Sequence, residues 1–448
     1  MSVAEGSDTT RSALAKGAPT LFISQVIGNI GFFVAVLILA RGLGPSGRGV
    51  VAFCTVFALI AAEVTNLGVP TATTYAVARD EPSRGQLLTA CYTFGFALSA
   101  ALAGIAVLVL SVVPARPSFI DPKLLLLVWA GAITSAVLES GYGFLMGCQR
   151  FNQTFIFGSV APWLYATLLL AQRSIGELTA VRAVLFWVVA RGVAALLMFG
   201  ASLRLARPGL PNVSTAIRLL SFGLRAWPSS VGRFVNFRVD QIIMGFLAAE
   251  AALGIYAVAV NVSEILLYLP SAVASALIPS VAMGLPRTHT AEILTNFRKT
   301  LCLTLLALGG SLLFSPVLIP LVFGSAFQGS VLPFVILSFG SVGYTMSAIF
   351  SSTTLGLGSP VRSAAGPLVA LVVGVILDFA LIPPAGANGA ALATTAAFLA
   401  GGVAAAAVFR RLHPFELRQL VPTARDVRDL ASAARSRLPR LRRTRSQP

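Results

Sequence analysis

The sequence predicts an all-α, polytopic membrane protein of about 12 transmembrane helices, arranged as two six-helix lobes around a central cavity. Two compositional observations predict this class: 56% of the 448 residues are hydrophobic and only 11% are charged. A soluble domain has about 25% charged residues, and the mean hydropathy here is +0.85. The third observation is length, because twelve spans of roughly 20 residues each fit within the chain. Soluble enzymes, disordered proteins and disulfide scaffolds are therefore excluded.

Apolar windows separated by Gly, Pro and charged residues place the twelve spans. The spans of the N-terminal lobe, 17–203, are predicted at 17–40, 49–72, 86–113, 124–147, 154–172 and 183–203. The spans of the C-terminal lobe, 219–410, are predicted at 219–247, 253–283, 300–323, 331–356, 361–383 and 389–409. The remaining segments, predicted to be cytoplasmic, are the N-terminus 1–16, the inter-lobe linker 204–218 and the basic tail 411–448.

Lys and Arg residues concentrate in alternate loops, on the side that also holds the N-terminus. The outer loops of the second lobe contain no Lys or Arg. Because such residues are retained on the cytoplasmic side, both termini are predicted to be cytoplasmic. The expected location is the inner, or cytoplasmic, cell membrane.

The tail is rich in arginine, and its apolar residues recur at helical spacing. These residues are Val427, Leu430, Ala434, Leu438 and Leu441. The pattern predicts a basic amphipathic helix that lies on the anionic lipids of the inner leaflet; a disordered tail is the alternative. The net charge of +17 does not indicate nucleic-acid binding, because much of it lies in this tail.

Two internal matches indicate that the lobes are copies of one unit. Arg48-Gly-Val-Val-Ala-Phe after the first span corresponds to Leu253-Gly-Ile-Tyr-Ala-Val after the seventh. Gly147 at the end of the fourth span corresponds to Gly356 at the end of the tenth. An even number of spans in each copy makes these parallel repeats, related by an axis along the membrane normal, and such proteins commonly bind substrate between their lobes.

A polar stripe follows the seventh span and predicts one wall of a hydrated cavity, with the first, second and eighth spans as the others. The predicted substrate-binding residues are Arg225, Arg233, Arg238, Asn236, Gln25 and Asn29. Arginine suits an anionic group because its guanidinium supplies paired donors for phosphate. Two structural alternatives stay open. Arg225 can extend to the inner interface, and Arg233 or Arg238 can form an internal pair with Asp240.

Acidic residues inside spans are candidates for ion coupling, because a proton or Na⁺ site needs a buried carboxylate. The predicted coupling residues are Glu264, Asp378 and Asp240, with Glu139 as a further candidate. Arg191, in the middle of the sixth span, is predicted to be the partner of one of the acids. The sequence does not indicate which one.

No catalytic residue, metal site or cofactor is predicted. His289 and His413 have no neighbouring acid or nucleophile that would suggest catalysis. The four cysteines lie in apolar runs, at no spacing typical of a metal site or a disulfide. The chain is therefore predicted not to be an enzyme.

Several segments resemble one family and occur in the same order. They are Leu39-Ala-Arg-Gly-Leu-Gly-Pro-Ser-Gly-Arg-Gly, Asn66-Leu-Gly-Val-Pro, Gly147-Cys-Gln-Arg-Phe, Val239-Asp-Gln-Ile-Ile-Met-Gly with Gly254-Ile-Tyr-Ala-Val-Ala, and Leu381-Ile-Pro-Pro-Ala-Gly-Ala-Asn-Gly-Ala-Ala-Leu-Ala-Thr. Over residues 10–412 the chain resembles the polysaccharide (Wzx-like) flippase branch of the multidrug/oligosaccharidyl-lipid/polysaccharide (MOP) exporter superfamily.

This resemblance implies a transporter that moves a polyprenyl-diphosphate-linked oligosaccharide from the inner to the outer leaflet for polysaccharide biosynthesis, by alternating access. It implies that Arg225 and Arg233 are among the cationic cavity residues that meet the substrate. Glycosyltransferases or a polymerase are the further partners expected. The lipid II flippase branch typically has arginines in its first helix and usually has fourteen helices. This chain has an uncharged first span and twelve predicted spans, and both differences argue against lipid II as substrate. The alternatives are a cation-coupled multidrug exporter of the same superfamily and a non-transporting scaffold for glycosyltransferases.

Overall fold

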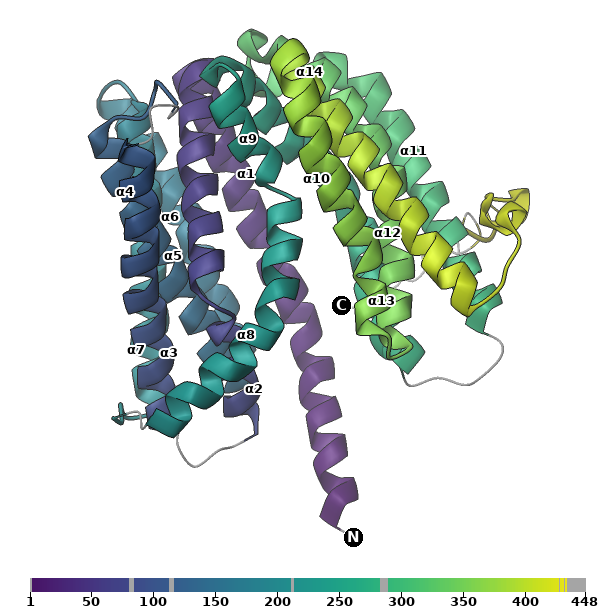
Figure 1. Ribbon diagram of the computed structural model, residues 1–448, viewed down its shortest axis with the longest axis horizontal. Coiled ribbons are helices and arrows are strands. Elements are labelled where there is room, and N and C mark those ends of the chain that lie inside the picture. Colours follow the sequence, from purple (N-terminus) through teal and green to yellow (C-terminus); the bar gives the residue numbers. More distant parts are fainter. Residues whose placement is uncertain are drawn as a thin grey trace, which may run out of the picture. The chain divides into compact units, whose positions relative to one another are not determined.

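A computed structural model describes residues 2–79, 84–112, 117–210, 213–282, 289–426, 428–430 and 432, except for the side chains of 2–26, 228–230, 233, 234, 279, 282 and 289. All regular secondary structure in this described part is helical (Figure 1). The predicted all-α class is therefore confirmed.

Contacts divide the chain into two compact units, which are described separately. The first unit contains Met1–Ala257 and Val322–Phe327, and the second contains Val258–Leu321 and Gln328–Pro448. The division falls within α10, after Ala257. Residues 219–257, which follow the predicted linker, therefore belong to the first unit. The lobe boundaries 17–203 and 219–410 stay a prediction.

The helices of the first unit are α1 (Ser2–Thr65), α2 (Val69–Ala78), α3 (Arg84–Leu98), the π-helical turn η1 (Ser99–Ala103), α4 (Gly104–Val112), α5 (Pro122–Gly147), α6 (Phe151–Ile175), α7 (Ala180–Leu205), α8 (Val213–Asn236) and α9 (Val239–Leu247). α10 (Glu250–Ala282) begins in this unit and continues in the second. The other elements are α11 (His289–Phe323), η2 (Ser325–Ser330), α12 (Val331–Gly356), α13 (Pro360–Ser363), α14 (Ala365–Leu412) and η3 (Leu417–Leu420).

Nine helical stretches of the described residues are long and apolar enough to cross a membrane. Two of these contain a sharp bend, at Gly44 with φ 65° and at Gly386 with φ 53°, so each covers two predicted spans. Positive φ is easy only for glycine, which explains the position of both bends. The more polar α8 and α9 cover the predicted seventh span. The described helices therefore account for the twelve predicted spans.

The predicted second span is broken between α1 and α2. Leu67 and Gly68 have φ values of 49° and 70°, which turn the chain out of the helix. Trp227 of α8 donates its indole N–H to the carbonyl oxygen of Val64, at 3.0 Å. A carbonyl near the break thus has a partner, as hydrocarbon surroundings require.

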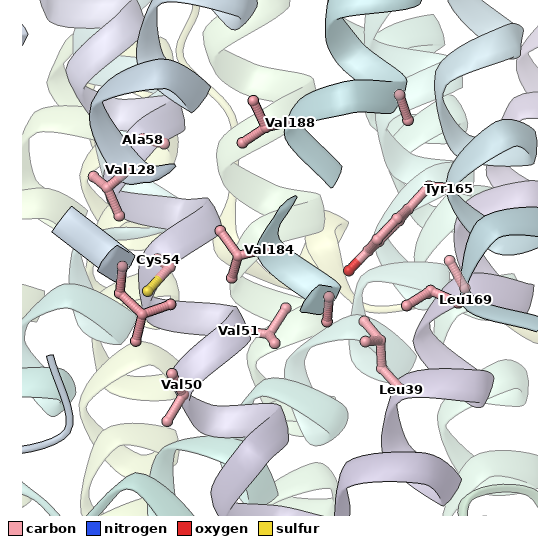
Figure 2. Close-up of a cluster of buried hydrophobic side chains, with 14 of the residues drawn as sticks. Leu39, Val50, Val51, Cys54, Ala58, Val128, Tyr165, Leu169, Val184 and Val188 are labelled. Carbon is pink, nitrogen blue, oxygen red and sulfur yellow. The ribbon is translucent and has the colours of Figure 1, made fainter. Parts of the chain in front are cut away.

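Small and branched apolar side chains fill a core of the first unit. Figure 2 shows part of this cluster, with Val50, Val51 and Cys54 of α1 beside Val128 of α5 and residues of α6 and α7. Lipid is as apolar as these side chains, so helices in a membrane associate through close packing more than through exclusion of water. Alanine and valine suit this because they let the helix backbones approach closely.

Equivalent helices of the two units end in the same hydrogen-bonded turn. After Gly147 of α5, the next three N–H groups donate to carbonyls four, three and five positions earlier, and the same pattern follows Gly356 of α12. The residue with left-handed backbone is Gln149 in the first turn (φ 57°) and Gly358 in the second (φ 75°). Both turns are Schellman-type caps, which satisfy the last carbonyls of a helix.

The packing around these two turns also corresponds. A Cβ atom added to Gly147 would lie 2.8 Å from the Cβ of Val77 on α2. A Cβ atom added to Gly356 would lie 3.0 Å from the Cβ of Val281 on α10. The same helix end therefore meets the same kind of neighbour in each unit, which supports the repeat that the sequence indicates.

Gly49 and Gly254 correspond in the predicted repeat. Each glycine packs against the carbonyl group four residues before the other. A Cβ on Gly49 would lie 1.8 Å from the carbonyl oxygen of Glu250, and a Cβ on Gly254 would lie 1.9 Å from the carbonyl oxygen of Pro45. Reciprocal contacts between equivalent residues are typical of a two-fold relation. Only glycine fits at either position, because the obstacle is backbone.

The first part of the tail is attached to α11. Asp426 accepts hydrogen bonds from Arg298 (Nε, 2.9 Å) and from both the backbone and hydroxyl of Thr423 (2.8 and 2.6 Å). Burial acts to raise the pKa of Asp426, but these hydrogen bonds outweigh it and lower the pKa to about 2. Of the amphipathic repeat predicted for the tail, only Leu430 lies within the described residues.

Candidate functional site

A pocket of about 540 Å³ lies inside the first unit, between α1, α5, α6 and α7. Its walls combine aromatic rings with a few polar groups, a composition common in ligand sites. The aromatic lining includes Phe32, Tyr142, Phe155, Tyr165 and Trp187, and the polar lining includes Asn29, Ser159 and Arg191. Of the predicted substrate-binding residues, Asn29 thus lies at this pocket.

Arg191 of α7 is held in place by two neighbours. Its Nε donates to the hydroxyl of Ser135 on α5 at 2.7 Å. Its guanidinium lies over the ring of Trp187, 5.3 Å from the centroid. A cation over a tryptophan face is attracted by the ring electrons. The remaining side of the guanidinium contributes to the pocket lining.

Glu139 of α5 lies within electrostatic range of Arg191. The charges of Arg191 and of Glu63, on α1, both act on the Glu139 carboxylate. Ser135, Glu139 and Tyr142 are spaced four and three residues apart, which places them on one face of α5. Of these three, Tyr142 lines the pocket and Ser135 bonds to Arg191. Which acid pairs with Arg191 stays a prediction.

Tyr142 reaches the pocket because α6 has a glycine opposite it. A Cβ added to Gly158 would lie 1.9 Å from the Tyr142 hydroxyl oxygen. Any larger residue at 158 would displace that hydroxyl from the wall beside Ser159. The pocket is therefore shaped by a missing side chain on α6 as well as by the polar face of α5.

A second, smaller concavity of about 220 Å³ lies between α2, α3 and α8. Arg218 and Arg225 of α8 line it. Tyr75 of α2 stacks on Phe222, with ring centroids 4.7 Å apart, and the guanidinium of Arg79 lies 4.4 Å from the Tyr75 centroid. Arg225 is exposed here. This arginine-lined groove can accept an anionic group at its edge.

The junction between α8 and α9 carries three further predicted residues. Asn236 ends α8 and Arg238 precedes α9, both half-buried. Asp240 is buried, accepts a hydrogen bond from the hydroxyl of Tyr256 on α10, and also accepts one from the backbone N–H of Gln241 at 2.8 Å. These bonds fix Asp240 at the start of α9.

The remaining predicted residues are distributed between the units. Glu264 is half-buried on α10 and Asp378 is buried on α14, both in the second unit. Gln25 lies on α1 and Arg233 on α8, but their side chains lie outside the described part. The cavity predicted between the first, second, seventh and eighth spans stays a prediction.

Trp187 and Tyr142, which line the pocket, escaped sequence reasoning although a signal was present. Trp187 and Arg191 are four residues apart on one helix, the spacing of a cation–ring pair. Ser135, Glu139 and Tyr142 form a polar stripe on an otherwise apolar span. The partnership of Tyr256 with Asp240 has no such signal, because the residues lie on different helices.

The described residues hold no cluster of three His, Cys, Asp or Glu side chains that could bind a metal ion. The four cysteines are free, and two of them, Cys54 and Cys91, are buried. The polar groups of the two concavities are instead arginines, hydroxyls and amides, which suit hydrogen bonding to an organic ligand.

Comparison with known families assigns the chain. A family model described as polysaccharide biosynthesis protein matches residues 14–285, which is more than half of the sequence. The chain belongs to this polysaccharide biosynthesis protein family. The match includes both concavities described above and the α8–α9 junction.

Two curated proteins of Haloferax volcanii are similar to part of the chain. "Probable low-salt glycan biosynthesis flippase Agl15" is 26% identical over 192 residues, which is 42% of this chain and 41% of that protein. "Probable flippase AglR" is 26% identical over 211 residues, 44% of this chain and 42% of that protein. The match thus spans less than half the length of each relative.

Solved structures show the same fold. The lipid II flippase MurJ, in an inward closed conformation, superposes with a TM-score of 0.74 at 13% identity and covers 89% of this chain and 88% of its own. An inward-facing multidrug resistance MATE family transporter of the MOP superfamily gives a TM-score of 0.66 at 16% identity, with 88% and 98% coverage. The chain therefore shares the fold of these two transporters, and its apolar helices make it a multi-pass membrane protein.

Proposed function

We propose that this protein flips a polyprenyl-diphosphate-linked oligosaccharide from the inner to the outer leaflet for polysaccharide biosynthesis. The family and the names of the two Haloferax relatives support this substrate class. The observation that carries the proposal is the series of arginines along α8 and just before α9, of which Arg218 and Arg225 line a groove. Arginine binds phosphate oxygens with paired, charge-assisted hydrogen bonds.

In this mechanism the lipid tail stays in the bilayer while the diphosphate and sugars cross a hydrated cavity. Arg225, Arg233 and Arg238 meet the diphosphate, and Asn29 and Asn236 hydrogen-bond to the head group. The two lobes rock so that the cavity opens to each side in turn, as alternating access requires. The protein acts as a transporter and forms no covalent intermediate.

The proposed setting is the cytoplasmic membrane with both termini inside. The proposed lipid contact is that of the basic tail 411–448 with anionic lipids, to which each basic residue near the surface would contribute about 1 kcal/mol of attraction. Glycosyltransferases or a polymerase are the proposed protein partners, because they make and consume the lipid-linked glycan. Glu264 and Asp378 remain the proposed ion-coupling residues of the second unit.

The test is mass spectrometry of polyprenyl-diphosphate glycolipids in cells that lack the protein. We expect a lipid-linked glycan to accumulate on the cytoplasmic side. Complementation with Arg233→Ala or Arg225→Ala should lower transport by about tenfold or more, because a hydrogen bond to a charged group contributes about 1.5–3 kcal/mol. Arg362→Ala, an exposed arginine of α13 outside the groove, is the matched control and should transport normally.

Two other results would replace this proposal. An unchanged glycolipid pool with increased sensitivity to cationic drugs would indicate a multidrug exporter. Normal flipping by the intact chain that is lost on deletion of 433–448 would indicate a tail-dependent scaffold. That deletion leaves the attached segment around Asp426 in place, so loss of activity could not be ascribed to the contact between the tail and α11.

A further inference from the structure

The pocket between α1, α5, α6 and α7 is a different site from the arginine-lined groove on α8. Its volume of about 540 Å³ lies within the range of about 300–1,000 Å³ that is usual for small-molecule sites. Asn29 and Phe32, which line it from α1, are exposed, so the pocket is open beside this helix. The proposed function gives Asn29 a hydrogen bond to the substrate head group but leaves the rest of the pocket without an occupant.

Arg191 gives this pocket a positive wall. Among the described residues that line it, Arg191 is the one that carries a charge. Its Nε donates to Ser135 at 2.7 Å, and within the described part of the chain it forms no other hydrogen bond and no ion pair. Its terminal nitrogens are therefore available to a ligand. Glu139 lies within electrostatic range of Arg191 but does not line the pocket, so a ligand meets the cation first.

The ligand group that fits Arg191 is a carboxylate. A guanidinium is planar, and its paired N–H donors match the two oxygens of a carboxylate. One positive charge in the wall balances the single charge of a carboxylate, whereas a phosphate monoester carries about −1.5 to −2 at neutral pH. Phosphate suits the groove of Arg218 and Arg225 better, because two cations line it.

The aromatic part of the wall suits a sugar ring. Tyr142, Phe155 and Trp187 line the pocket and are half-buried. The face of an aromatic ring is electron-rich and attracts positively polarised groups, such as the C–H groups on the faces of a pyranose ring. The guanidinium of Arg191 lies 5.3 Å from the Trp187 centroid, so a carboxylate bound there would hold its sugar beside this wall.

The remaining polar groups argue for hydroxyl groups on the ligand. Asn29 lies on α1, and Ser159 and Tyr165 lie on α6, so polar groups reach the pocket from more than one helix. Tyr165, drawn in Figure 2, is only 5% exposed, and its hydroxyl has no hydrogen-bond partner within the described part of the chain. An alkyl chain would leave such groups unpaired, which is costly. The hydroxyls of a sugar can both donate and accept.

We propose that this pocket binds a sugar ring that carries one carboxylate, as a hexuronic acid does. Arg191 binds the carboxylate, the aromatic wall contacts the ring, and the hydroxyl and amide groups bind its hydroxyls. Binding is non-covalent and breaks no bond. Because the sugar is taken to be part of the flipped glycan, this proposal rests on the proposed function. The transported glycan is thereby expected to be acidic.

The test is ligand binding to the purified full-length protein in detergent, measured by saturation-transfer difference NMR. The probe is methyl β-glucuronide at millimolar concentration, and we expect the strongest transfer at its ring protons. Methyl β-glucoside keeps the ring without the charge, and cyclohexanecarboxylate keeps the charge without the hydroxyls. Each should bind about tenfold more weakly than the glucuronide, because each loses one class of hydrogen bond.

Two substitutions locate the site. Arg191→Lys keeps the charge but loses the paired donors, so it should weaken glucuronide binding about tenfold and leave glucoside binding unchanged. Gly158→Ala adds a Cβ only 1.9 Å from the Tyr142 hydroxyl, which must then move, and should weaken binding of both sugars. The controls are on α7: Arg182→Lys, exposed and outside the pocket, and Gly200→Ala, where a Cβ has open space.

No binding of the glucuronide, or equal binding of the glucuronide and the glucoside, would overturn the proposal. Unchanged glucuronide binding by Arg191→Lys would also overturn it. Tighter binding of cyclohexanecarboxylate than of the glucuronide would assign the pocket to an apolar acid instead of a sugar. Each variant is first checked for monodisperse elution, and Gly158→Ala decides the location of the site if Arg191→Lys does not fold.

The glycolipid analysis described above separates this proposal from the proposed flipping. An accumulated lipid-linked glycan that contains an acidic sugar would support both. A neutral glycan that accumulates would contradict the acidic-sugar site and still support flipping. Glucuronide binding with no change in the glycolipid pool would support the site and contradict flipping.

Discussion

The two units share the same helix-ending turn, but the helices that end in it, α5 and α12, differ in their charged residues. α5 and α12 end in the same turn, and counting back from Gly147 and Gly356 pairs Ser135 with Tyr344, Glu139 with Ala348 and Tyr142 with Ser351. In the first unit, Ser135 accepts from a charged guanidinium at 2.7 Å. In the second unit, Tyr344 shares a neutral hydrogen bond with Ser271 at 2.9 Å. The fold of the repeat thus does not require the charges.

This difference indicates what the charged residues are for. α12 forms the same type of helix and the same cap with alanine where α5 has Glu139. A buried ion pair is weak evidence for stability, since apolar residues of similar size often stabilise as well or better. Arg191, which lines the pocket, is therefore better explained by ligand binding than by folding. The glycine contacts, by contrast, are shared because they position the helices.

The largest effect is expected at Gly49 and Gly254, because each packs directly against a backbone carbonyl. Gly49→Ala and Gly254→Ala should each destabilise the protein by more than about 3 kcal/mol, because overpacking costs about 1–3 kcal/mol even where side chains can yield and here the obstacle is a carbonyl. The measurements are the yield of monodisperse protein and its thermal unfolding. Gly200→Ala on α7, where a Cβ has open space, is the control. Tolerance of one substitution but not the other would argue against the reciprocal contact.

Arg191→Gln should come next, with a loss of about 2–4 kcal/mol, because it removes a charged hydrogen bond to Ser135 and the cation over the Trp187 ring. Glu139→Gln should cost much less, because glutamine keeps the shape of this half-buried side chain without its charge. Thermal unfolding of the purified variants at neutral pH measures both. Equal losses would mean that the pair is simply structural.

The same comparison can be extended to the second unit. Ala348→Glu places an acid at the position equivalent to Glu139, whereas the same count pairs Arg191 with Ala400 of α14. A loss of about 2.5–3.5 kcal/mol is expected from burial of the charge. A neutral result would show that the second unit can compensate an acid as the first does.

The smallest effect concerns the tail of the second unit. Because the pKa of Asp426 is lowered from 3.8 to about 2, its bonds to Arg298 and Thr423 stabilise the attached tail above about pH 4 and are lost as the pH falls toward 2. Hydrogen exchange of residues 417–426 should rise over that interval, by at most about tenfold for each unit of pKa difference. Asp426→Asn should show the higher exchange already at neutral pH. The exposed pair of Lys299 and Asp429 should contribute little at any pH.

The sequence was sufficient for the class, the spans and the repeat. Hydropathy and charge depend on composition over windows of about 20 residues, so twelve spans could be predicted without knowledge of their neighbours. Gly44 and Gly386 lie where Gly and Pro interrupt the apolar pattern, and both bends formed there. The correspondence of Gly147 with Gly356 also came from local residues, because a helix cap is a local structure.

The tertiary structure was needed to pair residues that lie on different helices. Periodicity shows which residues share a face of one helix, but not which face another helix presents to it. Arg191 could therefore be predicted to need a partner, whereas its hydrogen bond to Ser135 followed from the packing of α5 against α7. In the same way, Tyr256 became the partner of Asp240, and Asn29 joined Arg191 at one pocket while Arg225 lies in another. These pairings depend on how the whole bundle packs, which no local pattern encodes.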